Sequence, residues 1–117
     1  MRPSAWEFRP RWRVTRRGAI ALGPGKADLL AAIGHTGSIS AAARALGMSY
    51  RRAWLLVAAM NGCFARPLVA TSKRRSAGAA LSPDGRAVLA LYRRLEKKSV
   101  AACRRELALL RRRLRPS

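Results

Sequence analysis

The sequence predicts one small domain that is mainly helical with a minor β component, and three observations lead to this expectation. Apolar residues recur at helical spacing in several stretches after residue 26. Two other stretches hold short apolar segments on either side of a polar turn, which is typical of β-hairpins. Half of the 117 residues are apolar, and a chain of this length has room for one compact core.

The N-terminal part is expected to hold a basic arm and a hairpin. Residues 1–11 carry prolines and arginines without a sustained period and are interpreted as a flexible arm. The chain then alternates from Trp12 to Leu22 around residues 16–18, which predicts a short hairpin with a turn at those residues. Gly23-Pro24-Gly25 is expected to end this hairpin.

The first two helices are marked by their caps. Apolar residues of one helical stripe predict a helix over residues 26–35, and Gly37 stands where a left-handed C-terminal cap is wanted. Ser38 or Ser40 can cap the next helix, whose apolar residues repeat at helical spacing up to Leu46.

A third helix follows after a tight turn. Gly47 turns the chain, and Ser49 caps a helix that directs Ala53, Val57 and Met60 inward. Two short helices joined by a glycine-containing turn are typical of a helix-turn-helix, in which the second helix enters the major groove of DNA. Periodicity alone would also fit another small helical bundle.

The C-terminal half adds a second hairpin and a long helix. Residues 68–71 and 79–81 are expected to pair around a basic loop, which makes a wing; a disordered loop is the alternative. Ser82-Pro83-Asp84 supplies a cap, a first-turn proline and an acid, so a helix is expected from there to about Arg113.

The last helix has an apolar stripe that one small domain cannot cover. We therefore expect a homodimer contact along it, with a frayed basic tail as the alternative. The stripe consists of Val88, Leu91, Tyr92, Leu95, Cys103, Leu107, Leu110 and Leu114. Together these elements predict a winged helix-turn-helix over residues 12–97, with residues 98–117 as a helical extension for dimerisation or a basic tail.

The charge requires a polyanionic partner. Twenty-five Lys and Arg face five Asp and Glu, which gives a formal charge of +20. Because the imbalance runs along the whole chain, nucleic acid is the expected partner, and an anionic membrane surface ranks second.

Neither an enzyme nor a metal protein is expected. Five scattered carboxylates and one histidine, His35, offer no acid, base and nucleophile group, so His35 is interpreted as structural. Cys63 and Cys103 lie far apart without a CxxC motif, so we expect two buried thiols in a reducing compartment and no metal site. The sequence shows no membrane-spanning run or secretory signal, and cytoplasmic residence is expected.

Residue identities add a family resemblance. The segments Gly37-Ser38-Ile39-Ser40-Ala41-Ala42-Ala43 and Leu46-Gly47-Met48-Ser49-Tyr50-Arg51-Arg52-Ala53-Trp54 resemble the N-terminal DNA-binding domain of molybdate-responsive regulators of the ModE type. The resemblance extends over residues 12–97, and the layout is similar, more distantly, to the DNA-binding domain of LysR-type regulators.

The resemblance implies a winged helix-turn-helix that dimerises through its terminal helix and binds operator DNA. Two departures are visible. The family's wing is rich in glycine, whereas residues 71–78 here are mostly basic and polar. Full-length members carry C-terminal molybdate-binding domains, and this sequence ends at Ser117, so we expect no cofactor and no small-molecule effector.

The DNA contacts are expected from the third helix, the start of the second helix and the wing. Arg51 and Arg52 are the first choices for guanine edges, and serine hydroxyls near helix starts can donate to phosphates. For Trp54 and Tyr50 the alternative is a packing role, and for Ser38 and Ser40 a cap alone. The full set is Ser38, Ser40, Ser49, Tyr50, Arg51, Arg52, Trp54, Lys73, Arg74 and Arg75.

Sequence-specific regulation of transcription on double-stranded DNA is therefore the expected function. A nucleoid-associated protein that coats DNA without reading it would carry the same charge and differ in its specificity ratio. An RNA-binding or ribosome-associated protein is a further alternative, although sheet aromatics and glycine-rich RNA motifs are missing. A membrane-surface or partner-binding helix over residues 84–114 is the last.

Overall fold

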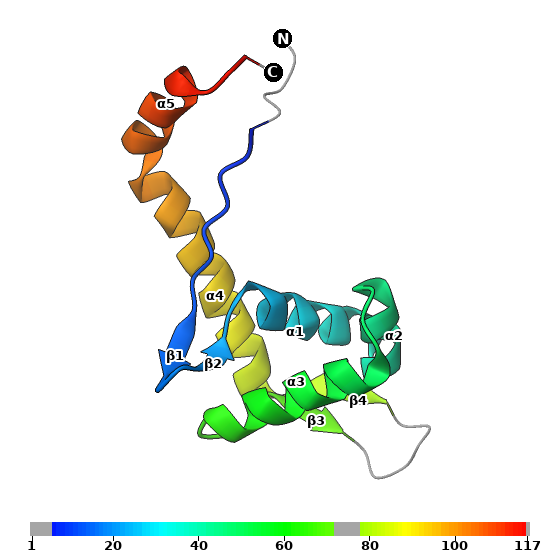
Figure 1. The fold of residues 1–117 in the computed structure, drawn as a ribbon. Helices are drawn as coiled ribbons and strands as arrows, with labels where there is room; N and C mark the ends of the chain where they lie inside the picture. The colour runs from blue at the N-terminus through cyan, green and yellow to red at the C-terminus, as the bar shows by residue number, and fades with distance from the viewer. Residues whose placement is uncertain (1–5, 72–77, 117) are drawn as a thin grey trace.

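Three helices make the core of the domain, and a fourth extends away from it (Figure 1). The computed structural model describes residues 6–71 and 78–116. In chain order the elements are β1 (Val14–Arg16), β2 (Ala19–Leu22), α1 (Pro24–Thr36), α2 (Ile39–Ala45), α3 (Tyr50–Cys63), β3 (Val69–Thr71), β4 (Ala79–Leu81), α4 (Pro83–Ala102) and α5 (Arg104–Arg113). The mainly helical class with two hairpins is as predicted.

The core lies where α1, α2 and α3 meet the two hairpins and the first half of α4. Its largest fully buried side chains are Tyr92, Leu29, Leu30, Ile33, Met60 and Leu68. The helical stripes predicted for α1 and α3 thus face the core. Burial of each such side chain contributes roughly 1.5–3 kcal/mol to the stability of the fold.

The first helix begins earlier than predicted. Pro24 occupies the first turn of α1, with Gly23 as the cap residue. A proline is well placed there because its missing N–H has no intrahelical partner at that position. The predicted end is confirmed, since Gly37 is left-handed with φ 72° and its N–H donates to the Ile33 carbonyl over 2.8 Å.

The helix-turn-helix is formed by local capping. The Ser38 hydroxyl accepts from the Ala41 N–H over 3.1 Å, so Ser38 rather than Ser40 caps α2. Ser49 caps α3 in the same way by accepting from the Arg52 N–H over 3.1 Å. Between them Gly47 has φ +67°, a conformation in which a side chain would be strained.

The two hairpins are stabilised by different interactions. In the β1–β2 hairpin, Arg17 and Gly18 both have positive φ, as a tight two-residue turn between antiparallel strands requires. Strands β3 and β4 also pair antiparallel. The side chain of Asn61 fixes β3 to α3: its Oδ1 accepts from the N–H groups of Leu68 and Val69, and its Nδ2 donates to the Val69 carbonyl.

A close backbone approach explains the glycine in the first turn of α4. Ser82 caps the helix by accepting from the Gly85 N–H over 3.0 Å. A Cβ at Gly85 would lie 2.1 Å from the Leu68 carbonyl oxygen. The glycine therefore lets α4 pack against the start of β3.

The long terminal helix predicted up to Arg113 is wrong, because the structure has two helices that meet at Cys103. Cys103 has φ −99° and ψ 15°, outside helical geometry, and α5 turns away from the axis of α4 (Figure 1). One turn earlier the Ser99 hydroxyl donates to the Leu95 carbonyl, a bond that bends helices. The Trp12 indole N–H in turn donates to this hydroxyl.

The segment before β1 runs along α4 and α5. The Tyr92 hydroxyl donates to the Trp12 carbonyl over 2.9 Å, and the Trp6 indole donates to the Arg115 carbonyl over 2.8 Å. Residues 6–11 of the arm predicted from sequence thus follow the two C-terminal helices (Figure 1). No helix within residues 6–71 and 78–116 is long and apolar enough to cross a membrane.

Candidate nucleic-acid interface

Helix α3 has one buried and one exposed face. Ala53, Val57 and Met60 are buried, as predicted. Tyr50 and Trp54 lie on the opposite side, 56% and 49% exposed. Neither aromatic side chain is therefore buried in the core.

Arg51 and Arg52 lie exposed in the first turn of α3. Neither guanidinium forms an ion pair or hydrogen bond with another residue that the structure describes. The first turn also lacks an acidic residue. The helix dipole adds partial positive charge at this end, so the start of α3 is suited to an anion.

The serines combine exposure with capping. Ser49 is exposed although its hydroxyl oxygen accepts the cap bond, and Ser40 is exposed in the first turn of α2. Ser38 is half-buried and acts as the cap. Ser49 lies at the end of the tight turn that leads into α3, whereas Ser38 and Ser40 lie at the opposite end of α2. The predicted wing contacts Lys73, Arg74 and Arg75 lie outside the described residues.

A group of cations lies beside α3, and Arg52 is the one member of it that the sequence analysis singled out. An open hollow of about 510 Å³ separates the β1–β2 hairpin from the starts of α1 and α3. Its charged lining residues are Arg11, Arg13, Lys26 and Arg52. The alternation of arginine at residues 9, 11 and 13 is the only sequence signal that could have pointed to them.

The stripe predicted for dimerisation is divided between several environments. Tyr92 is 1% exposed and lies in the core of its own protomer, and Val88 packs against that core. Neither of the two is therefore part of an open stripe. Leu91, Leu95 and Leu110 remain on the surface, 56%, 45% and 56% exposed.

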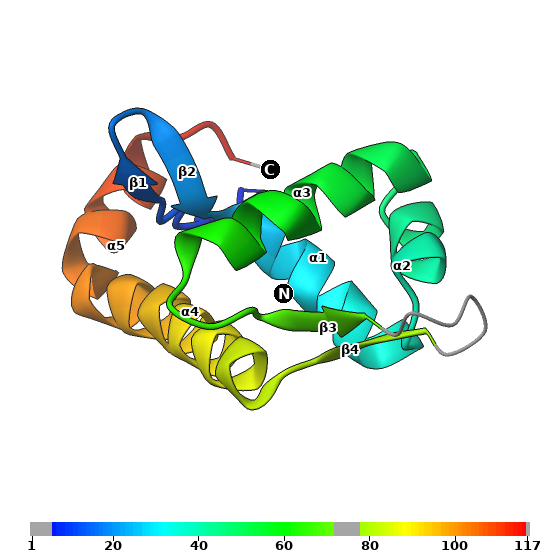
Figure 2. The same ribbon diagram turned by 90° about the horizontal axis from the view of Figure 1, so that it is seen from below.

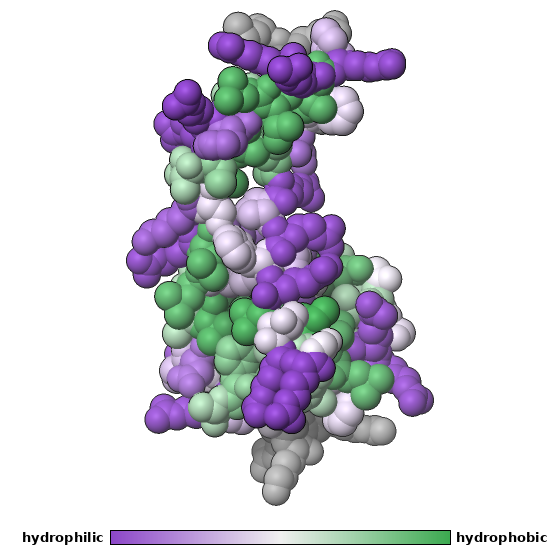
Figure 3. Space-filling view, turned by 60° about the vertical axis from the view of Figure 1, so that its left-hand side comes forward, coloured by the Kyte–Doolittle hydropathy of each residue, from purple (hydrophilic) through white to green (hydrophobic). Residues whose placement is uncertain are grey.

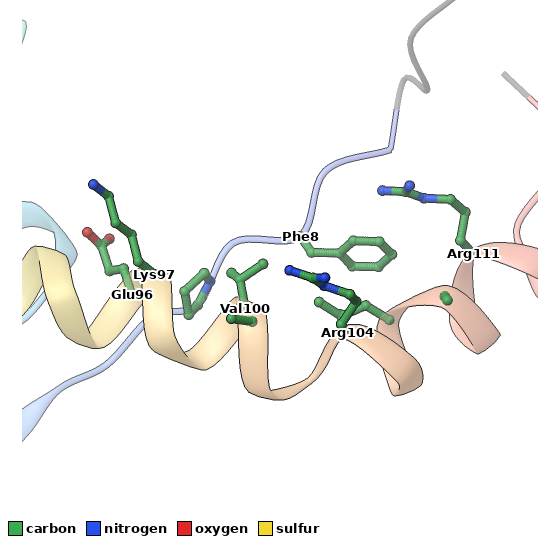
Figure 4. Close-up of a pocket in the computed structure, with 10 residues that line it drawn as sticks. Phe8, Glu96, Lys97, Val100, Arg104 and Arg111 are labelled. Carbon is green, nitrogen blue, oxygen red and sulfur yellow. The ribbon is translucent and has the colours of Figure 1, made fainter.

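The remaining members of the stripe lie near the N-terminal segment. Leu107 lines a hollow of about 590 Å³ between this segment and the bend from α4 to α5, and Cys103 lines a smaller one next to it. Leu114 is half-buried at the end of α5. Figure 4 shows Phe8 and Arg111 at the first hollow, where the guanidinium carbon lies 5.1 Å from the ring centre.

Figure 3 shows hydrophobic residues in two groups on one face, with hydrophilic residues between and around them. The molecule thus combines open apolar surface with dense positive charge.

The predicted burial of the two cysteines is wrong. Cys63 at the end of α3 and Cys103 at the helix bend are both exposed. Apolar helix spacing does not bury them because both lie where a helix ends. Among residues 6–71 and 78–116, no group of His, Cys, Asp and Glu side chains could hold a metal ion.

One ionic cluster joins α1 to α4. The Arg93 guanidinium donates to Glu96 over 2.9 Å and to Asp28 over 3.1 Å. The hydrogen bond to Glu96 is the main cause that raises the pKa of Arg93. Burial raises the pKa of the neighbouring Tyr92 phenol.

Known proteins with similar sequence share about a third of their length with this chain. It is 46% identical over 85 residues to the molybdenum-pterin-binding protein MopB of Rhodobacter capsulatus, and this match covers 71% of the chain and 32% of the relative. For MopA of the same organism the identity is 39% over 85 residues, with the same shares covered. For the molybdenum transport protein ModE of Azotobacter vinelandii it is 35% over 95 residues, covering 80% of this chain and 35% of the relative.

A solved structure has the same fold. It is described as the crystal structure of a CbnR_DBD-DNA complex, and it matches with a TM-score of 0.60 at 22% identity. The match covers 74% of this chain and 95% of the other. The fold class predicted from sequence is thereby confirmed, and the predicted similarity to ModE-type proteins is confirmed by the curated relatives.

The family model for bacterial regulatory helix-turn-helix proteins of the lysR family matches residues 26–86, more than half of the chain. This span contains α1 from its third residue on, the helix-turn-helix, β3, β4 and the first turn of α4. It is a family of DNA-binding domains and not of enzymes. The chain therefore belongs to the LysR family of bacterial regulatory helix-turn-helix proteins.

Proposed function

We propose that this chain is a sequence-specific DNA-binding transcriptional regulator that places α3 in the major groove. The observation that carries the proposal is the exposed and unpaired first turn of α3, where Tyr50, Arg51, Arg52 and Trp54 extend from a helix that contains no acid. A helix of this kind fits the major groove, and arginine can bind the O6 and N7 atoms of guanine with two hydrogen bonds.

The other contacts have a positioning role. Exposed Ser40 and Ser49 lie at the starts of α2 and α3, where a hydroxyl and nearby backbone N–H groups can donate to phosphates. Ser38 acts there as the cap that orients α2. Phosphate contacts fix the orientation of a protein on DNA and carry no sequence information by themselves.

The active form is a homodimer that uses α4 and α5. Support comes from Leu91 and Leu95, one helical turn apart on α4, and from Leu110 on α5, all of which lie open to solvent. Residues 98–117 then serve as a dimerisation extension of the domain over residues 12–97. A dimer would present two α3 helices to the two halves of a palindromic site.

The test compares Arg51→Ala with the wild-type chain on a duplex selected from a random library and on a scrambled duplex. Loss of a two-bond guanine contact should cost roughly 1–3 kcal/mol on the selected duplex and much less on the scrambled one. The matched control is Arg112→Ala on α5, which removes the same charge at the end of the molecule far from α3 (Figure 1).

The same binding measurements distinguish a sequence-specific regulator from a protein that coats DNA and from an RNA-binding protein. Equal losses on both duplexes would remove Arg51 from base reading and favour a protein that coats DNA without sequence preference. Binding to single-stranded RNA that exceeds binding to any selected duplex would contradict the proposal as a whole.

A further inference from the structure

The hollow beside α3 is lined by cations from three separate parts of the fold. Arg11 and Arg13 come from the segment that enters β1, Lys26 from the first turn of α1, and Arg52 from the first turn of α3. The hollow is open and measures about 510 Å³. Residues far apart in sequence thus surround one concave surface.

These cations are not neutralised within the part of the chain that the structure describes. Arg11, Arg13 and Arg52 form no ion pair with any residue in 6–71 or 78–116. Lys26 donates to the Ile20 carbonyl, which orients its side chain without removing its charge. A concave surface lined by one sign of charge concentrates the field and attracts a counter-ion.

The uncharged lining of this hollow also allows a ligand to come close. Gly23, Pro24 and Gly25 make one wall, and a Cβ added at Gly25 would meet no atom within 4 Å. The backbone N–H groups in the first turn of a helix have no intrahelical partner and are suited to an oxyanion. Ammonium and guanidinium groups beside an open backbone can bind a phosphate, and the apolar side chains of Ile20, Met48 and Leu56 also line the hollow.

The position of the β1–β2 hairpin indicates that the phosphate belongs to the backbone of bound DNA. Seen from below, the β1–β2 hairpin and the β3–β4 hairpin lie on opposite sides of α3 (Figure 2). A helix in the major groove, which is about 12 Å wide, lies between two sugar-phosphate backbones. The flank of α3 that carries Arg52 and the hollow therefore faces one of these backbones when α3 occupies the groove.

We propose that the β1–β2 hairpin is a second wing, and that Arg11, Arg13, Lys26 and Arg52 bind a phosphate of the DNA backbone in the hollow between this hairpin and α3. The inference rests on the proposed function of DNA binding and extends it to a surface to which Arg11 and Arg13 contribute from upstream of residues 26–86, the span of the family match. The bound backbone flanks the groove that α3 reads, so the contact adds affinity without sequence preference.

The test is the salt dependence of DNA binding by an Arg11→Ala/Arg13→Ala double variant. Loss of two of the four cations at this phosphate should weaken selected and scrambled duplexes by about the same factor. It should also reduce the slope of log K against log salt by up to about 0.9, the contribution of one phosphate on duplex DNA. The matched control is Arg112→Ala/Arg113→Ala on α5, which removes two exposed arginines away from the hollow.

A second variant separates charge from folding. Arg11→Lys/Arg13→Lys keeps both positive charges and should keep most of the slope, while melting temperatures of all variants should stay close to that of the wild type. An unchanged slope in the alanine variant would overturn the second wing and leave DNA binding intact. Equal slope losses in the hollow and α5 variants would overturn it as well, because net charge alone would explain them. A wild-type chain that binds no duplex at all would instead contradict the proposed function.

Discussion

The regions around α4 and around α3 differ in whether their arginines have acidic partners. At α4 the Arg93 guanidinium forms ion pairs with Asp28 and Glu96, which join α1 to α4. The sequence between Asp28 and Asp84, which includes α2 and α3, contains no acidic residue. Among the described residues, one arginine of α4 is thus neutralised within the protein, whereas Arg51 and Arg52 at the start of α3 have no acidic partner.

Net charge alone therefore does not identify which surface of the protein binds DNA. Arginines are present on both regions, but only those without an internal partner can neutralise phosphates at no cost to the fold. Substitutions in the two regions should therefore affect different properties: DNA affinity around α3, and assembly or stability around α4.

Charge reversal on α3 should give the largest effect. Arg51→Glu/Arg52→Glu replaces two attractive contacts by repulsive ones, and affinity for duplex DNA should fall by about 100-fold or more, since each contact is worth roughly 1–3 kcal/mol. Fluorescence anisotropy with a labelled duplex measures this. Arg112→Glu/Arg113→Glu on α5 is the control, and an equal loss there would remove the distinction between the regions.

Reversal of polarity on α4 should change the oligomeric state. Leu91→Glu/Leu95→Glu introduces repelling carboxylates into the exposed apolar surface, so the variant should be a monomer at concentrations where the wild type is a dimer. Sedimentation equilibrium measures the mass of both. Arg94→Glu, on the same helix, is the control for added negative charge, and a wild type that stays monomeric with and without DNA would contradict the dimer.

Loss of the ionic cluster should reduce stability and leave DNA affinity unchanged. Because the Arg93 side chain is 38% exposed, its ion pairs are screened by solvent, and Arg93→Ala should lower the free energy of unfolding by about 1 kcal/mol. Urea unfolding followed by circular dichroism measures this. A large drop in DNA affinity with unchanged stability would place Arg93 in the interface and break the comparison.

The smallest expected effect is the pH dependence due to Tyr92. Burial raises the pKa of its phenol in the folded state, so the fold favours the neutral form. The stabilisation is fully present below the ordinary pKa of about 10 and is lost as pH rises through the raised folded value. Tyr92→Phe should cost about 1 kcal/mol at neutral pH through the lost bond to the Trp12 carbonyl.

The same variant should unfold with a weaker pH dependence than the wild type above about pH 10. Melting temperatures of both chains across this range measure the difference. Parallel curves would show that ionisation of Tyr92 does not contribute.

The helix-turn-helix could be predicted from sequence because its determinants are local. Ser38, Ser49 and Gly47 act within one turn of their own positions, and the apolar face of α3 follows from helical spacing alone. The start of α4 was predictable for the same reason. The hairpin ends before Gly23 as expected, but Pro24 also occupies the first turn of α1, so the start predicted for that helix at residue 26 was late.

The bend at Cys103 and the basic hollow depend on contacts between distant segments. Ser99 receives a hydrogen bond from Trp12, which lies 87 residues earlier. The hollow exists because the β1–β2 hairpin folds beside α1 and α3, so no window of sequence contains its four cations together. Tyr92 was placed on a surface stripe since helical spacing cannot show that the N-terminal segment covers that side of α4.

Duplex DNA should bind the region around α3 and not the region around α4. Backbone amide NMR of the full chain, titrated with a short duplex, tests it residue by residue. We expect the largest shift changes in α3, at the start of α2 and in the β1–β2 hairpin, with the amides of α4 and α5 little affected. Shift changes confined to α4 and α5, with those of α3 unmoved at saturation, would contradict the account.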